Sequence, residues 1–358
     1  MLSILGSQFT LLYVLAVVIG LGLLIFFHEL GHFLGAKLCK VRVEKFAIGF
    51  GPEIFGFTKG NTRYSICWIP LGGMTKMAGE DLESKSGAKD EFFFQSWYRR
   101  IFIVASGPIM SYILAILLFA MVFYFAGVIR TSTVIGQVVK NKPAEKVGLK
   151  PGDKIVSVAG QKVIYWEDMA DIIQKNPNKE TELSAERGNF TITLKIVPEI
   201  DNLRRIGVIG IMPDMSRIIT DKVGIGKSLS YSINSVLNIS VGTLVVLGNS
   251  VIHLEKPDVG GPISVIYFIA KAAKLGFKDL IYMLGVISTA LGLFNLLPIP
   301  ILDGGHIFLF LGEGITRRPL SRKVVQVTNV IGLTIIGVIV LYALYSDILR
   351  FPQLLKFW

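Results

Sequence analysis

The sequence predicts a polytopic α-helical membrane protein with four transmembrane helices and one small α/β domain inserted between helices two and three. The first observation is a shortage of charge: 52% of the 358 residues are hydrophobic but only 18% are charged, and the mean hydropathy is +0.58. A globular domain carries roughly a quarter charged residues. The second observation is that long uncharged stretches alternate with stretches of ordinary composition. This pattern excludes a disordered chain, a disulfide scaffold and a single soluble domain.

Four uncharged stretches have the length of a spanning helix, which takes roughly 20 apolar residues. The predicted spans cover about residues 8–37, 101–129, 280–302 and 324–346. The first stretch lacks a basic region before its apolar run and a small-residue cleavage site after it, so we predict a retained helix and not a signal peptide. The two halves of the membrane core are then residues 1–129 and 280–358.

A fifth uncharged stretch, residues 228–252, differs because it contains six serines and three asparagines. Such a composition suits a helix that lies at the interface or packs on protein better than a helix that faces lipid. We therefore predict that residues 201–279 form a linker and membrane-associated amphipathic helices that do not cross the bilayer.

Basic residues near the predicted span ends indicate the orientation. Clusters within 37–45, 99–100 and 317–323 fall on one side of a four-span protein, which we assign to the cytoplasm. A fifth crossing at 228–252 would move the last cluster to the other side. Since part of the net charge of +11 then reflects orientation, we predict no nucleic-acid partner.

Residues 130–200 have the composition of a small soluble α/β domain. Strands are predicted at 134–139 and 155–158, a helix at 166–175, and a hairpin around Gly188-Asn189. This order of elements, together with the sequence GLKPGDKIVSVAGQKV, resembles a bacterial PDZ domain. The resemblance implies that an extended peptide or chain terminus binds by adding a strand to the sheet edge, and the alternative is a steric cap or spacer.

An H-E-x-x-H motif, His28-Glu29-Leu30-Gly31-His32, directly follows the first apolar run. Residues i and i+4 share a helix face, so His28 and His32 can present two imidazoles to one ion. Glu29 lies beside them, where it can take a proton from a metal-bound water. Three ionisable groups at this place are costly unless they serve a site. The alternative, polar residues that snorkel to the interface, fits Lys and Arg better than His and Glu.

A catalytic zinc ion usually takes three protein ligands and a water, so a third ligand is expected from elsewhere in the chain. The third predicted span ends in NLLPIPILDGG, residues 295–305, which carries Asp303. The prolines of this segment end or unwind the helix. Asp303 and the two histidines then lie at the cytoplasmic ends of their spans, and the sequence predicts that they meet at one depth.

H-E-x-x-H in one span and N-x-x-P-x-P-x-L-D-G in a later one resemble the site-2 protease family of intramembrane zinc metalloproteases, bacterial RseP type, here with a single PDZ-like domain. The resemblance implies that a Zn²⁺ ion is bound by three side chains, with a neighbouring carboxylate as the general base. The implied zinc ligands are His28, His32 and Asp303, and the implied base is Glu29. The residues implied to line the substrate path are Asn295, Pro298 and Pro300.

The family resemblance also implies the setting. Substrates would be transmembrane segments of single-pass membrane proteins, such as anti-sigma factors or remnant signal peptides, cut within the lipid bilayer. The protein would be a multi-pass protein of the bacterial cytoplasmic (inner) membrane, with the PDZ-like domain on the periplasmic side and the active site near the cytoplasmic side. Residues 45–80 would form a re-entrant, membrane-associated β-hairpin loop whose edge strand pairs with the unwound substrate. The alternative is a peripheral cytoplasmic loop.

Two features depart from the family pattern. Many relatives carry two tandem PDZ domains, and this chain has room for one. Relatives often begin the second span with A-G-P-x-x-N, whereas residues 106–111 read Ser-Gly-Pro-Ile-Met-Ser, which puts Ser111 at the asparagine position. No predicted metal ligand is affected. We predict that His253 and His306 lie outside the site, with a hydrogen bond from His306 to Asp303 as the alternative.

Two other functions compete with an intramembrane protease. A membrane-anchored metalloprotease with a soluble catalytic domain would need a large soluble region around H-E-x-x-H, where the sequence has an apolar run instead. A non-enzymatic membrane scaffold that displays the PDZ-like domain would leave Glu29 and Asp303 without a role. Nitrogen and oxygen ligands accept several divalent ions, so the choice of zinc rests on the family resemblance.

Overall fold

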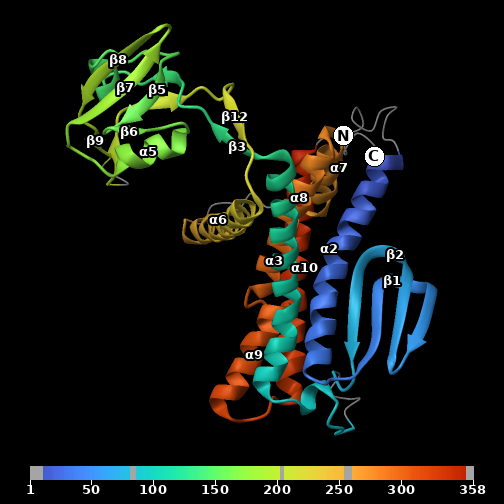
Figure 1. The fold of residues 1–358 in the computed structure, drawn as a ribbon. Helices are drawn as coiled ribbons and strands as arrows, with labels where there is room; N and C mark the ends of the chain where they lie inside the picture. The colour runs from blue at the N-terminus through green and yellow to red at the C-terminus, as the bar shows by residue number, and fades with distance from the viewer. Residues whose placement is uncertain (1–10, 81–85, 202–204, 254–259, 352–358) are drawn as a thin grey trace. The chain divides into compact units, whose positions relative to one another are not determined.

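The computed structural model describes residues 11–80, 86–201, 205–253 and 260–351 (Figure 1). The chain divides into two compact units. The membrane unit comprises Met1–Val122 and Ile225–Trp358, and the insert unit comprises Phe123–Gly224.

Four long helices of the membrane unit run beside one another (Figure 1). They are α2 (Leu11–Leu38), α3 (Trp97–Ala126), α8 (Phe277–Leu296) and α10 (Arg322–Arg350). Each is long and apolar enough to span a membrane, and the four correspond to the four predicted spans. Among the described residues, α6 (Ile225–Ile252) is a fifth helix of this kind, so the helices alone do not give a count of four. The chain is a multi-pass α-helical membrane protein with an additional β-rich part.

The third predicted span extends beyond the observed helix. α8 stops at Leu296, and residues 297–302 form a turn before the short helix α9 (Asp303–Thr316). Pro298 and Pro300 have no backbone N–H with which to continue the helix. Ile301 adopts a φ of 76°, in a left-handed region that a β-branched residue rarely enters. The proline-containing turn therefore places Asp303 at the first position of a new helix.

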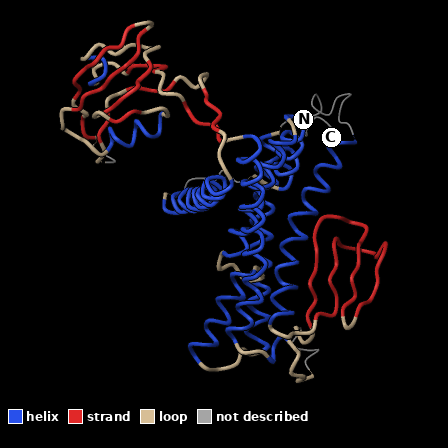
Figure 2. The backbone as a smooth tube through the Cα atoms, viewed as in Figure 1, coloured by secondary structure: helices blue, strands red, loops and turns tan. Residues whose placement is uncertain are grey.

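Helix α6 turns its polar face toward the protein. Ser228 and Ser232 are fully buried, and the Ser240 hydroxyl lies 3.3 Å from the Tyr112 hydroxyl of α3. Leu237 and Val241 on the other side of the helix are exposed. α6 runs across the direction of the other long helices (Figure 2). The serines are thus explained by packing on protein, which is one of the two arrangements predicted from the composition. Small polar residues permit close contacts between helices in an apolar environment.

A two-stranded sheet lies beside α2 (Figure 2). Its strands, β1 (Val43–Lys59) and β2 (Thr62–Met77), are long and bent, so each contributes two segments. Ala47 pairs with both Met74 and Ser65, and Ser65 also pairs with Gly56. The segments therefore lie in the order 73–77, 43–48, 63–67 and 53–59, and residues 73–77 form the edge nearest to α2. We call residues 73–77 the edge segment.

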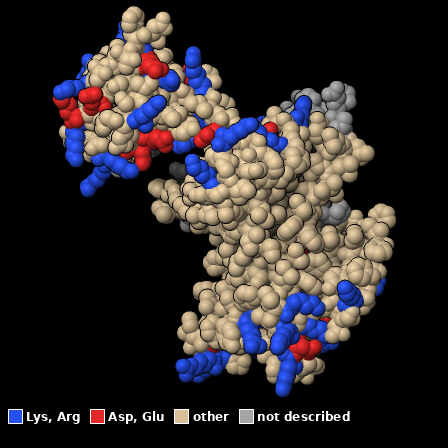
Figure 3. Space-filling model, viewed as in Figure 1, with Lys and Arg blue, Asp and Glu red and all other residues tan. Residues whose placement is uncertain are grey.

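Many charged residues of the membrane unit lie at one end of its helix bundle, and others lie at the opposite end (Figure 3). α2 ends, α3 begins and the connection between α9 and α10 turns at the first of these ends (Figure 1). The exposed basic residues of these segments are Lys37, Lys40, Arg99, Arg317, Arg318 and Lys323. The three basic clusters seen in the sequence thus lie at the same end of the helix bundle. The sequence alone could place them together only by assuming a topology.

Most of the insert unit is built on a four-stranded sheet in the order β6-β5-β7-β8. Its first elements are β3 (Val128–Thr131), β4 (Ile135–Val138), α4 (Pro143–Lys146), β5 (Lys154–Val158), β6 (Gln161–Lys162) and α5 (Trp166–Gln174). The later elements are β7 (Thr181–Arg187), β8 (Phe190–Ile196), β9 (Glu199–Ile200), β10 (Gly207–Val208), β11 (Ile211–Pro213) and β12 (Ile218–Asp221). β11 pairs with β4 and β12 pairs with β3, so the unit is wider than residues 130–200.

The turn before β5 is held by an ion pair between a buried aspartate and a partly exposed arginine. Asp153, 1% exposed, accepts hydrogen bonds of 2.7 Å from Nε and from the terminal guanidinium nitrogen of Arg187, and one of 2.8 Å from the Lys150 backbone. The Arg187 guanidinium holds the pKa of the Asp153 carboxyl below its usual range, because these hydrogen bonds favour the charged form. Asp153 therefore has a structural role in the insert unit.

Candidate metal centre

Three side chains from two helices converge in the membrane unit. His28 and His32 come from consecutive turns of one face of α2, and Asp303 is the first residue of α9. The His28 Nε2 and Asp303 Oδ2 atoms are 3.2 Å apart, and His32 Nε2 lies 3.5 Å from Asp303 Oδ1. The two Nε2 atoms are 3.3 Å from each other. Within the described part of the chain, this is the one group of three such side chains whose ligand atoms all lie within 4.8 Å.

The converging atoms are hydrogen-bond acceptors. The His32 Nδ1 atom lies 3.2 Å from the Ile103 carbonyl oxygen, which can only accept, so in the neutral ring the proton is on Nδ1 and the Nε2 lone pair faces Asp303. Asp303 Oδ2 is buried and accepts no hydrogen bond from any described residue. Buried acceptors without a donor are costly, and a cation relieves that cost. The donor set of two imidazoles and one carboxylate therefore fits a zinc ion.

Glu29 is held beside these side chains by the edge segment. The Thr75 hydroxyl lies 2.7 Å from Glu29 Oε2 and 3.0 Å from the Glu29 backbone oxygen. A Cβ atom at Gly73 would lie 2.7 Å from Glu29 Cγ, so glycine is needed for the sheet edge to approach α2 this closely. The carboxylate is therefore oriented by a strand that lies 46 residues further along the chain.

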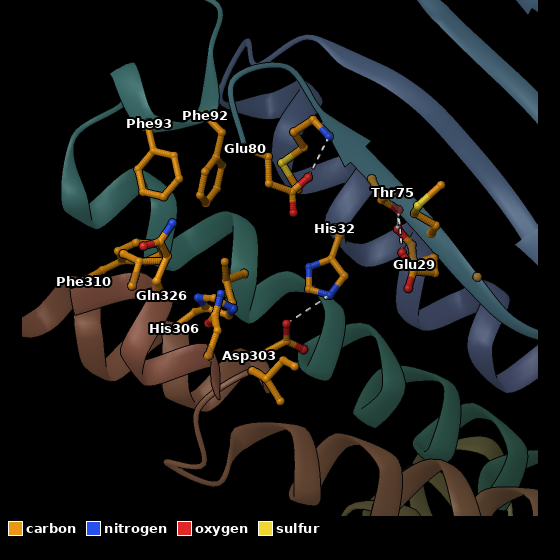
Figure 4. Close-up of a pocket in the computed structure, with 17 residues that line it drawn as sticks. Glu29, His32, Thr75, Glu80, Phe92, Phe93, Asp303, His306, Phe310 and Gln326 are labelled. Carbon is orange, nitrogen blue, oxygen red and sulfur yellow. Dashed lines mark hydrogen bonds and ion pairs between the residues drawn. The ribbon is translucent and has the colours of Figure 1, made fainter. Parts of the chain in front are cut away.

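A cavity of about 840 Å³ opens beside the three converging side chains (Figure 4). Glu29 and His306 lie on opposite sides of the pair formed by His32 and Asp303 in this view. The rest of the cavity wall comes from the edge segment, the turn after α8, and helices α3, α9 and α10. It includes Gly73, Met74, Thr75, Val104, Ile301, Phe310, Gln326 and Asn329. Such a cavity gives water, the co-reactant of hydrolysis, room next to the candidate base.

The two histidines predicted outside the site differ. His253 is exposed, and its Nδ1 atom lies 3.0 Å from the Asn249 carbonyl oxygen of the preceding helix α6. His306 lies in the cavity wall, one helical turn after Asp303. The sequence predicts His306 in a loop close to Asp303, and the structure instead places it in a helix, because α9 begins at Asp303 and its first turn faces the cavity.

The residues predicted to line the substrate path occupy the end of α8 and the turn that follows. The Asn295 amide nitrogen donates to the Leu291 carbonyl oxygen at 2.9 Å. Pro298 and Pro300 lie in the turn, and a Cβ atom at Gly332 of α10 would come within 2.2 Å of the Pro300 oxygen. In the described residues the cavity wall takes Ile301 from this turn rather than these three.

Sequence reasoning missed the cavity residues that come from other elements. Thr75 carries no motif, and the only signal was its place in an alternating strand. Gln326 and Asn329 are polar residues three apart in an apolar helix, which is the pattern of one polar stripe on a spanning helix. Asn329 Oδ1 is buried and has no hydrogen-bond partner in the described chain.

An H-E-x-x-H helix packed against a distant aspartate inside a membrane-type helix bundle defines a class of protein, the membrane-embedded metalloproteases. Comparison with known proteins agrees. A family model described as Peptidase family M50 matches residues 16–339. A protein of Agrobacterium fabrum with a provisional zinc metalloprotease name is 33% identical over 94% of this chain and 95% of its own length. One of Clostridium acetobutylicum, with a name of the same kind, is 35% identical over 92% and 96%.

A further relative is the regulator of sigma-W protease RasP of Bacillus subtilis, which is 29% identical over 94% of this chain and 98% of its own length. Among solved structures, the PDZ domain of an SdrC-like protein from Listeria monocytogenes has a TM-score of 0.21 and 22% identity, over 23% of this chain and 87% of that domain. The chain belongs to peptidase family M50, the site-2 proteases, and is a zinc-dependent intramembrane protease.

Proposed function

We propose that the protein is an intramembrane endopeptidase in which His28, His32 and Asp303 hold the zinc ion and Glu29 is the general base. The observation that carries this assignment is the convergence of three acceptor atoms, one of them the unpaired Asp303 Oδ2, next to Glu29 in a cavity. Substrates are transmembrane segments of single-pass membrane proteins.

The reaction divides between the metal and the chain. Zinc, when bound, supplies Lewis acidity and lowers the pKa of a water toward ~7. The Glu29 carboxylate takes the proton of the attacking water and delivers it to the leaving amine. Thr75 holds Glu29 Oε2 in place, so the carboxylate is oriented before substrate arrives.

The edge segment is the proposed docking strand for the substrate. A transmembrane helix satisfies its backbone internally and must unwind before a peptide bond can be attacked. An edge strand supplies N–H and C=O partners to the unwound stretch. The support is that Gly73, Met74 and Thr75 line the same cavity as Glu29. Asn295, Pro298 and Pro300 would act one layer further out, by shaping the turn that carries Ile301 and Asp303.

We infer an orientation with the shared basic end of the membrane unit in the cytoplasm, since positive residues flank cytoplasmic span ends. Four crossings with α6 packed on the bundle, the insert unit on the periplasmic side and the centre nearer the cytoplasm fit this rule. The proposed substrates are of the anti-sigma factor or remnant signal peptide type, and the name of the Bacillus subtilis relative, regulator of sigma-W protease, supports a link to a sigma factor.

The decisive test of the site is Glu29→Gln in the full-length protein, purified in detergent and assayed on a transmembrane helix substrate. Loss of the general base should lower cleavage by roughly 10²–10⁴-fold while zinc content stays near one per chain. Glu44→Gln, at an exposed position of β1, is the control and should cleave normally. Full activity of Glu29→Gln, or an equal loss in the control, would refute the assignment.

The insert unit is proposed to exclude substrates that still carry a large outer domain, with peptide binding at its sheet edge as a second role. Deletion of the whole insert unit between the end of α3 at Ala126 and the start of α6 at Ile225 should raise cleavage of such intact substrates and leave cleavage of short ones unchanged. The two substrates are compared in the same membranes. Unchanged selectivity between the two substrates after the deletion would contradict the excluding role and favour the alternative that the insert unit is a spacer.

A further inference from the structure

Helix α3 faces the outer nitrogens of both histidines. His28 Nδ1 lies 3.0 Å from the Ser111 hydroxyl oxygen, and His32 Nδ1 lies 3.2 Å from the Ile103 carbonyl oxygen. Ser111 is fully buried. Both contacts lie on the side of the rings opposite to Asp303, since the Nε2 atoms are the ones that face it.

The proton positions at Ser111 follow from its second neighbour. Its hydroxyl lies 3.4 Å from the Gly107 carbonyl oxygen, one turn earlier in α3. A carbonyl only accepts, so when the hydroxyl proton points to Gly107 the Ser111 oxygen lone pair is free to accept from His28 Nδ1–H. A neutral imidazole carries one N–H, and placing it on Nδ1 leaves Nε2 as a free acceptor.

We propose that Ser111 is a positioning residue that fixes the tautomer and ring orientation of His28, so that Nε2 is presented to the metal. This inference rests on the proposed function, because it takes His28 as a zinc ligand. Outer hydrogen-bond partners of metal-bound histidines generally set the ring orientation and raise ligand basicity. The Ile103 carbonyl does the same for His32, so one helix that supplies no ligand orients both histidines.

The position of Ser111 is itself secured from two sides. The Ser288 hydroxyl of α8 donates to the Ser111 carbonyl oxygen at 2.8 Å. A Cβ atom at Gly107 would lie 2.2 Å from His32 Nε2, so the glycine lets α3 approach α2 closely enough for these contacts. The serine at position 111 thus supplies a hydrogen-bond acceptor next to His28.

The test measures zinc affinity, by competition with a chelator, in full-length protein purified in detergent. Ser111→Ala removes the acceptor and should weaken zinc binding by roughly 10–100-fold. The absorption spectrum of the Co²⁺-loaded protein should change with it, and kcat should fall with KM unchanged. Ser111→Thr keeps the hydroxyl and should restore most of the affinity. Should Ser111→Ala fail to fold, Ser111→Cys, which is close in size and a weak acceptor, should show the same direction of change.

The matched control is Ser232→Ala in α6. Ser232 is also fully buried and its hydroxyl also donates to a carbonyl one turn earlier, that of Ser228, at 2.7 Å. Its zinc affinity and Co²⁺ spectrum should equal those of the wild type. Equal affinity and spectrum in Ser111→Ala, or an equal loss in Ser232→Ala, would overturn the role of Ser111. A wild-type protein that binds no zinc would instead overturn the proposed ligand set.

Discussion

Two aspartates with buried carboxylate oxygens, one in each unit, have opposite surroundings. Asp153 of the insert unit receives hydrogen bonds on both oxygens, from Arg187 and from a backbone N–H. Asp303 of the membrane unit faces two histidine acceptors, and its Oδ2 atom has no donor in the described chain. A buried carboxylate that its own chain satisfies stabilises the fold, whereas one left without donors is kept for a cation.

The largest effect should come from Asp303→Asn. The amide has no charge and brings a donor to a cluster of acceptors, so zinc should be lost and cleavage should fall by more than the 10–100-fold typical of an outer partner. The metal-free protein should unfold at the same temperature as wild type or higher, since a carboxylate whose buried Oδ2 atom lacks a hydrogen-bond donor is removed. Zinc content, cleavage and thermal unfolding in detergent are measured together. A large drop in the stability of metal-free Asp303→Asn would mean that Asp303, like Asp153, has a structural role, and would contradict the contrast between the two aspartates.

Asp153→Asn should show the reverse pattern. It removes a charge-assisted pair, so the insert unit should lose about 1.5–3 kcal/mol of stability while zinc content stays unchanged. Hydrogen exchange of insert-unit peptides in the full-length protein measures this loss. Asp171→Asn, which breaks an exposed pair with Lys175, is the control and should change stability by less than about 1 kcal/mol. Equal exchange in both variants would contradict a structural role for Asp153.

A third buried aspartate extends the comparison. Asp347 of α10, fully buried, accepts hydrogen bonds from the backbone of Gly261, Ile263 and Ser264, at the start of α7 (Pro262–Leu275). Loss of this helix cap in Asp347→Ala should cost about 1–2 kcal/mol. Hydrogen exchange should rise in α7, and less so in Asp347→Asn, which keeps one acceptor. Unchanged hydrogen exchange in Asp347→Ala would contradict a structural role for Asp347.

The smallest effect is the pH dependence of the insert unit. The pKa of Asp153 is lower in the folded state than its usual value of about 3.9. The ion pair with Arg187 therefore stabilises the insert unit above that pH, and this stabilisation is lost as the pH falls through the folded-state pKa. The stability difference between wild type and Asp153→Asn should therefore be constant between about pH 7 and pH 5 and shrink below about pH 4. Hydrogen exchange corrected for intrinsic rates gives the comparison. A difference that grows toward acid would have the wrong sign.

Much of the site was predictable because its signals are local. The helix period predicts that His28 and His32 share one helix face, and the prolines before Asp303 predict a break in the third span. The end of that span, the position of His306 and the orientation of Glu29 by Thr75 were not predictable. Each depends on where a second element packs, and no periodic pattern encodes that position.

The sequence by itself determined the apolar spans, the metal-binding chemistry of the first span and the family. These features depend on composition and on residues within one or two helical turns. Only the tertiary structure decided that α3 contacts both histidines, that an edge strand holds Glu29 and that Asp303 Oδ2 lacks a hydrogen-bond donor in the described chain while both oxygens of Asp153 have one. The His28–Ser111 contact joins residues 83 positions apart. Hydrogen-bond partners at such separations exist only after the helices pack, because packing alone brings each donor to its acceptor.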